Sequence, residues 1–179
     1  YNSISSLERI VAENKNKSLD RKLIVINGQE ITRSMPPGHI NAIFLNDANK
    51  LLLPKDSVRG ILAANEQDAF VFWNHPAWPA QRSDGIAKLD EFHKYLIEKK
   101  FLHGIEVVNE LYYSEEALRL ALENDLTIMG TSDIHGLVDW LFKVPDDNES
   151  SNGTLPGHRP VTIIFSKDKS EDGIKAVSY

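Results

Sequence analysis

The sequence contains no cysteine. Disulfides and thiolate zinc sites are therefore excluded, and any metal ion must be held by histidine, aspartate or glutamate side chains. No run of about 18 apolar residues occurs, so we expect no membrane-spanning helix. An excess of positive charge is also lacking, because the formal net charge is -6. A nucleic-acid partner, which requires a basic face, is therefore not expected.

The chain also lacks an initiator methionine and a leader-like segment at Tyr1. We interpret this start as a trimmed terminus, and earlier removal of a signal peptide stays an alternative. The protein is expected to be soluble, in either the cytoplasm or the periplasm. Its 179 residues fit one domain with a sizeable core. The sequence predicts no second domain and leaves the oligomeric state open.

Short apolar runs alternate with amphipathic stretches, a pattern typical of βα units around a parallel sheet. Strands are predicted at residues 23–26, 39–45, 69–73, 105–108, 127–130 and 161–165. Helices are predicted at residues 3–16, 56–65, 89–96, 114–122 and 138–142, and after residue 170. A polar loop is predicted at residues 145–157. This order fits an open, doubly wound sheet or a (β/α) barrel without its N-terminal part, since a closed barrel usually needs about 200 to 250 residues.

Polar side chains follow several of these strands at the point where each strand ends. Glu30 comes just after the first strand, His75 follows the third, and Asp133 and His135 follow the strand at 127–130. The carboxyl ends of parallel strands meet on one face of a sheet or barrel, so these side chains are expected to converge. Neighbouring buried carboxylates and imidazoles are stable together when a cation joins them. The pattern therefore predicts a metal site.

Each of these residues, taken alone, also has an ordinary structural interpretation. The pair Asp133-x-His135 is common by chance, and His75 is equally compatible with a core histidine bonded to a carbonyl. His39 fits a satisfied surface histidine beside a turn, and Glu30 fits a capping or ion-paired carboxylate. Only the shared position at strand ends favours metal binding by the whole set.

Five short motifs occur in an order that resembles the polymerase and histidinol phosphatase (PHP) family. They are Gly28-Gln29-Glu30-Ile31, Gly38-His39-Ile40-Asn41, Asn74-His75-Pro76, Gly104-Ile105-Glu106-Val107-Val108-Asn109 and Gly130-Thr131-Ser132-Asp133-Ile134-His135. The resemblance implies a distorted (β/α)7-type barrel with parallel strands whose N-terminal βα units are missing. Residues 1–179 would then form the C-terminal part of a single PHP-like domain.

The resemblance also implies a cofactor: two or three divalent metals, which the ligand types restrict to Zn, Mn or Fe. Glu30 would bridge two metals, and His39 and His75 would bind one of them. Asp133 and His135 would complete the cluster. Glu106 would lie behind these ligands and orient one of them or a water molecule.

The sequence departs from the family in one respect. The N-terminal H-x-H motif and the histidine of the next strand are absent, and the chain alone is therefore expected to bind metal weakly or incompletely. His93 and His103 lie on a predicted helix and at its end, and they are expected to be surface residues rather than replacement ligands.

The implied reaction is hydrolysis of a small phosphate ester by a metal-activated water. Glu30 and Asp133 would act as catalytic carboxylates that hold the metals and help to keep the nucleophile deprotonated. Arg33 is the first candidate for a catalytic and phosphate-binding guanidinium, with Arg159 and its neighbour His158 second; a surface salt bridge is the alternative for each arginine. Trp78 is predicted to contact the substrate, whereas Trp73 is assigned to the core.

Two other functions compete with this one. A degenerate PHP fold would serve as a non-catalytic binding or scaffold module, which the incomplete ligand set favours. An amidohydrolase-like enzyme would use similar metals to cleave a C–N bond, but no predicted strand ends in the lysine that such enzymes usually place there. The identity of the substrate stays open.

Overall fold

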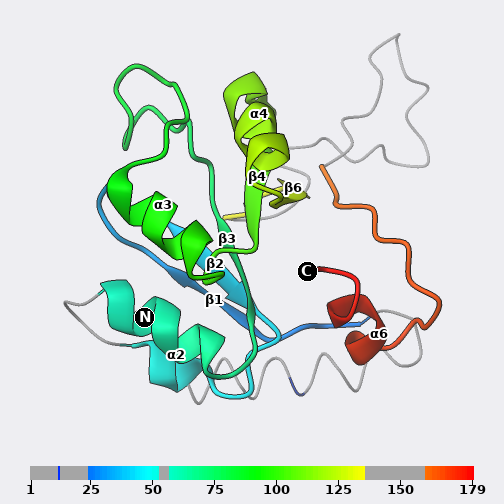
Figure 1. Ribbon diagram of the computed structural model, residues 1–179. Helices are drawn as coiled ribbons and strands as arrows, with labels where there is room; N and C mark the ends of the chain where they lie inside the picture. The colour runs from blue at the N-terminus through cyan, green and yellow to red at the C-terminus, as the bar shows by residue number, and fades with distance from the viewer. Residues whose placement is uncertain (1–11, 13–23, 53–56, 136–159) are drawn as a thin grey trace, which may run out of the picture.

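The computed structural model describes residues 12, 24–52, 57–135 and 160–179 (Figure 1). Most of the helix predicted at residues 3–16 and all of that at 138–142 lie outside the described residues. So do the loop at 145–157, His158 and Arg159. The described residues form a mixed α/β structure, so the predicted α/β class is confirmed. None of the described helices is long and apolar enough to cross a lipid bilayer.

A six-stranded sheet organises the described part of the chain. Its strands are β1 (Gly28–Ile31), β2 (Ile40–Ile43), β3 (Phe70–Trp73), β4 (Gly104–Asn109), β5 (Tyr112–Tyr113) and β6 (Thr127–Thr131). The order is β1-β2-β3-β4-β5, and β6 also pairs with β4. β2 is antiparallel to β1 and β3, whereas β4 is parallel to both β3 and β6. The described strands thus form an open, mixed sheet, and the predicted distorted (β/α)7-type barrel is not confirmed.

The expectation of a purely parallel sheet is wrong at β2. Only residues 32–39 connect β1 to β2, and a parallel crossover needs about a dozen residues or more. The short connection therefore forces an antiparallel hairpin. Because β2 runs in the reverse direction, its amino end lies at the same edge of the sheet as the carboxyl ends of β1, β3, β4 and β6.

The first strand lies later in the sequence than predicted, at residues 28–31 rather than 23–26. Gly28 pairs with Ile43 inside the hairpin. A Cβ atom at Gly28 would come within 2.9 Å of the Ala42 carbonyl oxygen, so glycine permits the close approach of the two strands. Glu30 accordingly lies within β1 and not after a strand.

The strand predicted at residues 161–165 is also wrong. Gly130 of β6 does hydrogen-bond to this segment, but through a side chain: its amide donates to the Thr162 hydroxyl (2.9 Å), which in turn donates to the Gly130 carbonyl (3.0 Å). The Thr162 hydroxyl therefore satisfies both backbone groups of Gly130 that a neighbouring strand would have used. The apolar side chains of residues 161–165 are largely exposed, and Phe165 is 90% accessible.

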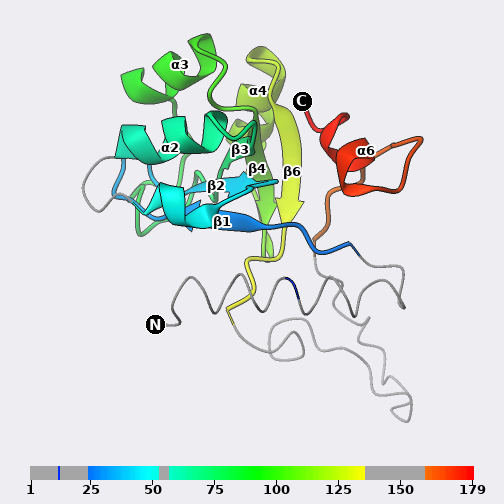
Figure 2. The ribbon, with the colours of Figure 1, turned by 90° about the horizontal axis from the view of Figure 1, so that it is seen from below.

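Three helices cover one face of the sheet (Figure 2). They are α2 (Ser57–Asn65), α3 (Glu91–Glu98) and α4 (Glu115–Glu123). All three lie close to the predicted ranges. The main core lies between these helices and the sheet, and Trp73 at its centre is fully buried, as predicted. A short 3-10 helix, η1 (Ala48–Leu51), packs next to α2.

His93 on α3 is fully buried, so the expectation of a surface position is wrong. Its ring stacks on Trp73 with 3.9 Å between the ring centroids. Its Nδ1 accepts from the Asp90 amide (3.2 Å) and its Nε2 lies 2.7 Å from the Pro37 carbonyl oxygen. Both contacts suit a neutral ring, and burial lowers the pKa of His93. This histidine is a structural residue that ties α3 to the β1–β2 connection.

The opposite face of the sheet carries a second apolar cluster, formed by Phe44, Phe70, Phe72 and Met129. Helix α6 (Glu171–Lys175) contributes Ile174 to the packing on this side. Successive residues of a strand point to opposite faces. Because Ile31 and Ile40 belong to the main core, their neighbours Glu30 and His39 point to this second face.

Candidate metal centre

Side chains from four segments meet around one cavity of about 200 Å³. The cavity lies at the edge of the sheet where β2 begins and where β1, β3 and β6 end. Glu30 comes from β1, His39 directly precedes β2, and His75 follows β3. Asp133 and His135 follow β6. All five residues that the sequence singled out line the cavity, together with Trp78, Asn109, Glu110 and Tyr112. The reversed direction of β2 is what allows His39, at a strand start, to join residues at strand ends.

Glu30 and His39 form a direct pair across the β1–β2 hairpin. The Glu30 Oε1 lies 2.8 Å from the His39 Nδ1, and the same oxygen accepts from the Thr32 hydroxyl at 2.8 Å. The pair is part-buried, with the two side chains 31% and 16% accessible. A carboxylate and an imidazole held this close offer oxygen and nitrogen ligands to one ion.

His75 is the candidate ligand whose environment best fits a metal. Its ring lies 4.9 Å from the His39 ring and 5.1 Å from the Trp78 ring, between centroids. Its Nδ1 is buried and has no hydrogen-bond partner among the described residues. Burial is the largest cause that lowers the pKa of His75, and the neighbouring His39 lowers it further. A neutral imidazole with a buried, unpartnered nitrogen is suited to bind a cation, since a metal requires the neutral ring.

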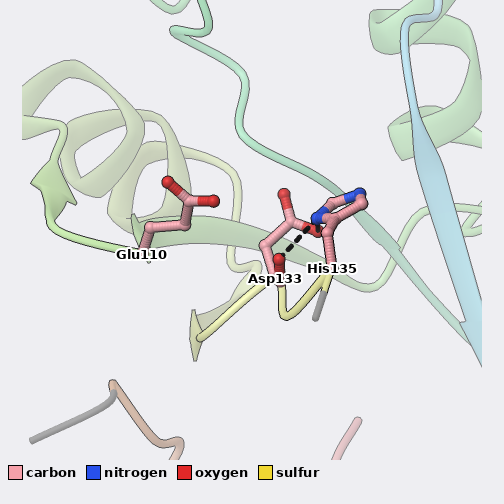
Figure 3. Close-up of side chains that lie close together, drawn as sticks. All are labelled: Glu110, Asp133 and His135. Carbon is pink, nitrogen blue, oxygen red and sulfur yellow. Dashed lines mark hydrogen bonds and ion pairs between the residues drawn. The ribbon is translucent and has the colours of Figure 1, made fainter. Parts of the chain in front are cut away.

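A third group of candidate ligands lies across the cavity. Glu110 follows β4, and one ligand atom from each of Glu110, Asp133 and His135 lies within 4.8 Å of the other two (Figure 3). The His135 Nδ1 is 2.7 Å from the Asp133 carbonyl oxygen, although the His135 ring is 76% accessible. Glu110 was not among the predicted site residues. Its position directly after a strand, the criterion used for the other residues, was the available signal.

Several of these residues have an unusual backbone conformation. The φ angle is +26° at His75, +51° at Glu110 and +42° at Asp133. Side chains other than glycine seldom adopt positive φ, and such residues cluster at functional sites because the fold must hold them there. At His75, which follows β3, the positive φ interrupts the alternation of side chains between the two faces of the sheet.

Glu106 of β4 lies behind His75 and is 2% accessible. Its Oε2 accepts from the His75 backbone amide (2.7 Å) and from the Asn109 side chain (2.8 Å), and its Oε1 accepts from the Thr131 hydroxyl (2.6 Å). The carboxyl group therefore joins β3, β4 and β6 beneath the cavity. Burial raises the pKa of Glu106 to about 7, against the hydrogen bonds, which lower it.

Glu106→Gln is expected to preserve this network. The glutamine oxygen would accept from the His75 amide and from Asn109, and its NH2 group would donate to the Thr131 hydroxyl, which rotates to accept. Glu106→Ala would leave all three donors unsatisfied. We expect it to cost about 1–3 kcal/mol of stability and to weaken metal binding about 10- to 100-fold. Chemical unfolding and calorimetric titration with Mn²⁺ measure the two effects, and equal losses in both variants would contradict the network.

A comparison of wild type with Glu106→Gln, both in metal-free form, tests the Glu106 pKa. Because the folded state holds this proton more tightly than the unfolded chain, the free energy of unfolding should fall as the pH rises from 4.5 to about 7, by at most about 3 kcal/mol. The buried histidines act in the opposite direction because their pKa values are lowered. The difference between wild type and the non-titrating Gln variant isolates the glutamate, and a pH-independent difference would contradict the raised pKa.

The predicted substrate-binding residues Trp78 and Arg33 lie in different places. Trp78 lies at the cavity, with its ring centroid 5.6 Å from that of His39. Arg33 is not among the cavity residues; its guanidinium donates to the Thr32 carbonyl (2.6 Å), and it lines a neighbouring depression that shares Glu30 with the cavity. Three residues past Glu30 the chain has left β1, so nearness in sequence did not bring Arg33 to the cavity.

The structure resembles a solved crystal structure of a two-domain protein from Bacteroides vulgatus ATCC 8482, which contains a predicted PHP-like metal-dependent phosphoesterase. The two chains are 38% identical with a TM-score of 0.82, over 94% of this chain and 46% of the other. This chain therefore spans just under half the length of that protein. No protein-family model matches the chain, and no curated protein matches it significantly. The likeness fits the PHP family, and Glu110, Asp133 and His135 are a group that could hold a metal ion.

Proposed function

We propose that this chain carries the site of a PHP-type phosphoesterase that hydrolyses a small phosphate ester with two or three divalent metals. Residues 1–179 would form the C-terminal part of one such domain. The observation that carries the proposal is the meeting of Glu30, His39, His75, Asp133 and His135 around one small cavity. These residues come from four segments spread over more than a hundred positions. The similar protein contains a predicted PHP-like metal-dependent phosphoesterase, which supports phosphate-ester hydrolysis as the reaction at this cavity.

The ligands divide into two groups. Glu30, His39 and His75 face one side of the cavity, and Asp133 and His135, now with Glu110, face the other. Imidazole and carboxylate donors suit Zn, Mn or Fe. Such ions, when bound, polarise the phosphoryl oxygens and lower the pKa of a water molecule so that it can attack phosphorus.

The other residues hold this arrangement in place. Glu106 fixes the backbone of His75 through its hydrogen bond to the amide, and Thr32 fixes the Glu30 carboxylate. Glu30 and Asp133 are proposed to keep the nucleophile deprotonated. The cavity is lined by carboxylates and rings and, among the described residues, by no arginine or lysine. The metals are proposed to balance the charge of a phosphate group there, with Arg159 and His158 as proposed additional contacts; Arg33, outside the cavity, stays a prediction for phosphate binding.

Metal removal tests the proposal. The full-length protein is treated with a chelator, dialysed, and assayed with phenyl phosphate before and after Mn²⁺ or Zn²⁺ is restored. We expect hydrolysis to be lost on chelation and recovered with metal, in proportion to the bound ion measured by atomic emission. Undiminished hydrolysis after complete metal removal would contradict the proposal. Metal binding without hydrolysis of any ester would instead indicate a non-catalytic binding module of the same fold.

A further inference from the structure

A second and larger cavity, of about 520 Å³, opens beside the candidate metal centre. The two cavities share His75, Trp78, Asn109, Glu110 and Tyr112 as lining residues. A molecule bound at the metals through one end can therefore extend into the larger cavity with its other end. We call this second space the adjoining cavity.

The wall of the adjoining cavity is mostly aromatic and apolar. Trp78, Tyr112 and Tyr113 line it together with Pro76 and Pro79. These three aromatic side chains are exposed, with accessibilities of 44%, 77% and 60%. Large apolar rings gathered at a cavity mouth, where water covers them in the free protein, are typical of a ligand contact.

The charge of the wall is equally informative. Among the described residues that line it, Glu106 and Glu110 are the only acidic ones, and no lysine or arginine is present. A negatively charged group placed there would leave water without a lysine or arginine side chain to pair with, which disfavours it. The wall therefore selects against anionic groups and in favour of uncharged, planar or bulky apolar ones.

The wall is also held firmly by the same strands that carry the candidate metal ligands. The Trp78 amide donates to the His75 carbonyl (2.9 Å), which folds the segment after β3 back toward the metal centre. Tyr112 and Tyr113 form β5 and pair with Asn109 and Val108 of β4. The segment with Trp78 and the strand with Tyr112 and Tyr113 are thus positioned before a ligand arrives, which lowers the entropic cost of binding.

From these observations we propose that the adjoining cavity binds the alcohol portion of the phosphate ester. The substrate class would be phosphate esters of uncharged aromatic or bulky apolar alcohols, in preference to esters that carry a further anionic group. Trp78 and Tyr112 are the specificity-determining residues. This inference rests on the proposed function. In the reaction a water oxygen bonds to phosphorus, the bond from phosphorus to the alcohol oxygen breaks, and the alcohol leaves with a proton.

Two esters that differ by one charge test the preference. The full-length protein with Mn²⁺ is assayed with 2-naphthyl phosphate and with its 6-carboxylate derivative. The carboxylate makes the naphthol the better leaving group, so a slower reaction cannot be a chemical effect of the substituent. We expect kcat/KM to be at least about 10-fold lower for the carboxylate ester, which corresponds to about 1.4 kcal/mol.

Three variants locate the effect. Trp78→Ala should lower kcat/KM for 2-naphthyl phosphate about 10-fold or more. Stacking of an aromatic ring the size of a nucleobase on an aromatic side chain contributes about 1–3 kcal/mol to binding, and the alanine removes it. Tyr112→Lys should raise kcat/KM for the carboxylate ester relative to the uncharged one. Tyr95→Ala, an exposed tyrosine on α3 outside both cavities, is the matched control and should change neither value.

A binding measurement completes the test. Quenching of tryptophan fluorescence by 2-naphthol in metal-free protein is expected for wild type and should weaken in Trp78→Phe. Hydrolysis of both naphthyl esters at equal rates, unchanged in Trp78→Ala and Tyr112→Lys, would overturn this inference and leave the proposed function standing. Absence of naphthol binding would overturn it as well. Absence of hydrolysis of every ester would overturn the proposed function, and the inference with it.

Discussion

Replacing His75 with alanine is expected to lower kcat/KM for phosphate-ester hydrolysis at least about 100-fold, more than loss of a residue behind the ligands usually costs. The expectation follows from the position of the ring, which lines the small cavity and lies 4.9 Å from the His39 ring. It also follows from the buried Nδ1 atom, for which the described residues provide no partner. Removing the ring deletes a proposed ligand and opens the cavity to water.

His103→Asn is the matched control for this measurement. His103 precedes β4 and so lies at the opposite edge of the sheet, where its Nδ1 accepts from the Val71 amide at 2.9 Å. The asparagine oxygen can accept the same hydrogen bond, so activity should stay within about twofold of wild type, since substitutions that keep their contacts are usually mild. Stoichiometry of bound metal is measured beside the rate. Wild-type kinetics in His75→Ala, with both proteins folded, would exclude His75 as a ligand.

The sequence predicted the contents of the site better than the shape of the sheet that holds it. Glu30 and His39 were expected to meet, and they do, at 2.8 Å. Their positions differ from the prediction, because Glu30 lies within β1 and His39 precedes an antiparallel strand. Strand direction decides which strand ends share an edge of the sheet, and the apolar pattern does not encode that direction. The length of the connection at residues 32–39 does encode it, through the minimum length of a parallel crossover.

Other features could not be predicted from local patterns. The run at residues 161–165 is as apolar as a strand, but the Thr162 hydroxyl takes up both backbone groups of Gly130. His93 was expected at the surface of its helix, yet it is buried, with its ring stacked on Trp73 and its two nitrogens in contact with the Asp90 amide and the Pro37 carbonyl. In both cases a tertiary contact between distant residues decided the outcome. Arg33 shows the converse, since nearness to Glu30 in sequence did not place it at the cavity.

Trp73→Ala is expected to produce the largest loss of stability. Trp73 is fully buried between the sheet and α3, where its ring stacks on His93 at 3.9 Å. Truncation of a buried tryptophan to alanine removes this contact and leaves a cavity, at a typical cost of about 3–5 kcal/mol. The melting temperature should fall by roughly 10 °C for a domain of this size. Circular dichroism and denaturant titration measure the change.

Trp78→Ala is the natural comparison, since it removes the same side chain from a partly exposed position, and its stability should stay within about 0.5 kcal/mol of wild type. Trp73→Phe should lie between the two. Phenylalanine keeps most of the stacking surface and removes the Trp73 Nε1 group, which is buried without a partner among the described residues. If Trp73→Ala and Trp78→Ala destabilised the protein equally, the division of these two residues between core and ligand cavity would be wrong. If only Trp73→Ala lowered stability while only Trp78→Ala changed the preference between esters, the two roles would be separated by experiment.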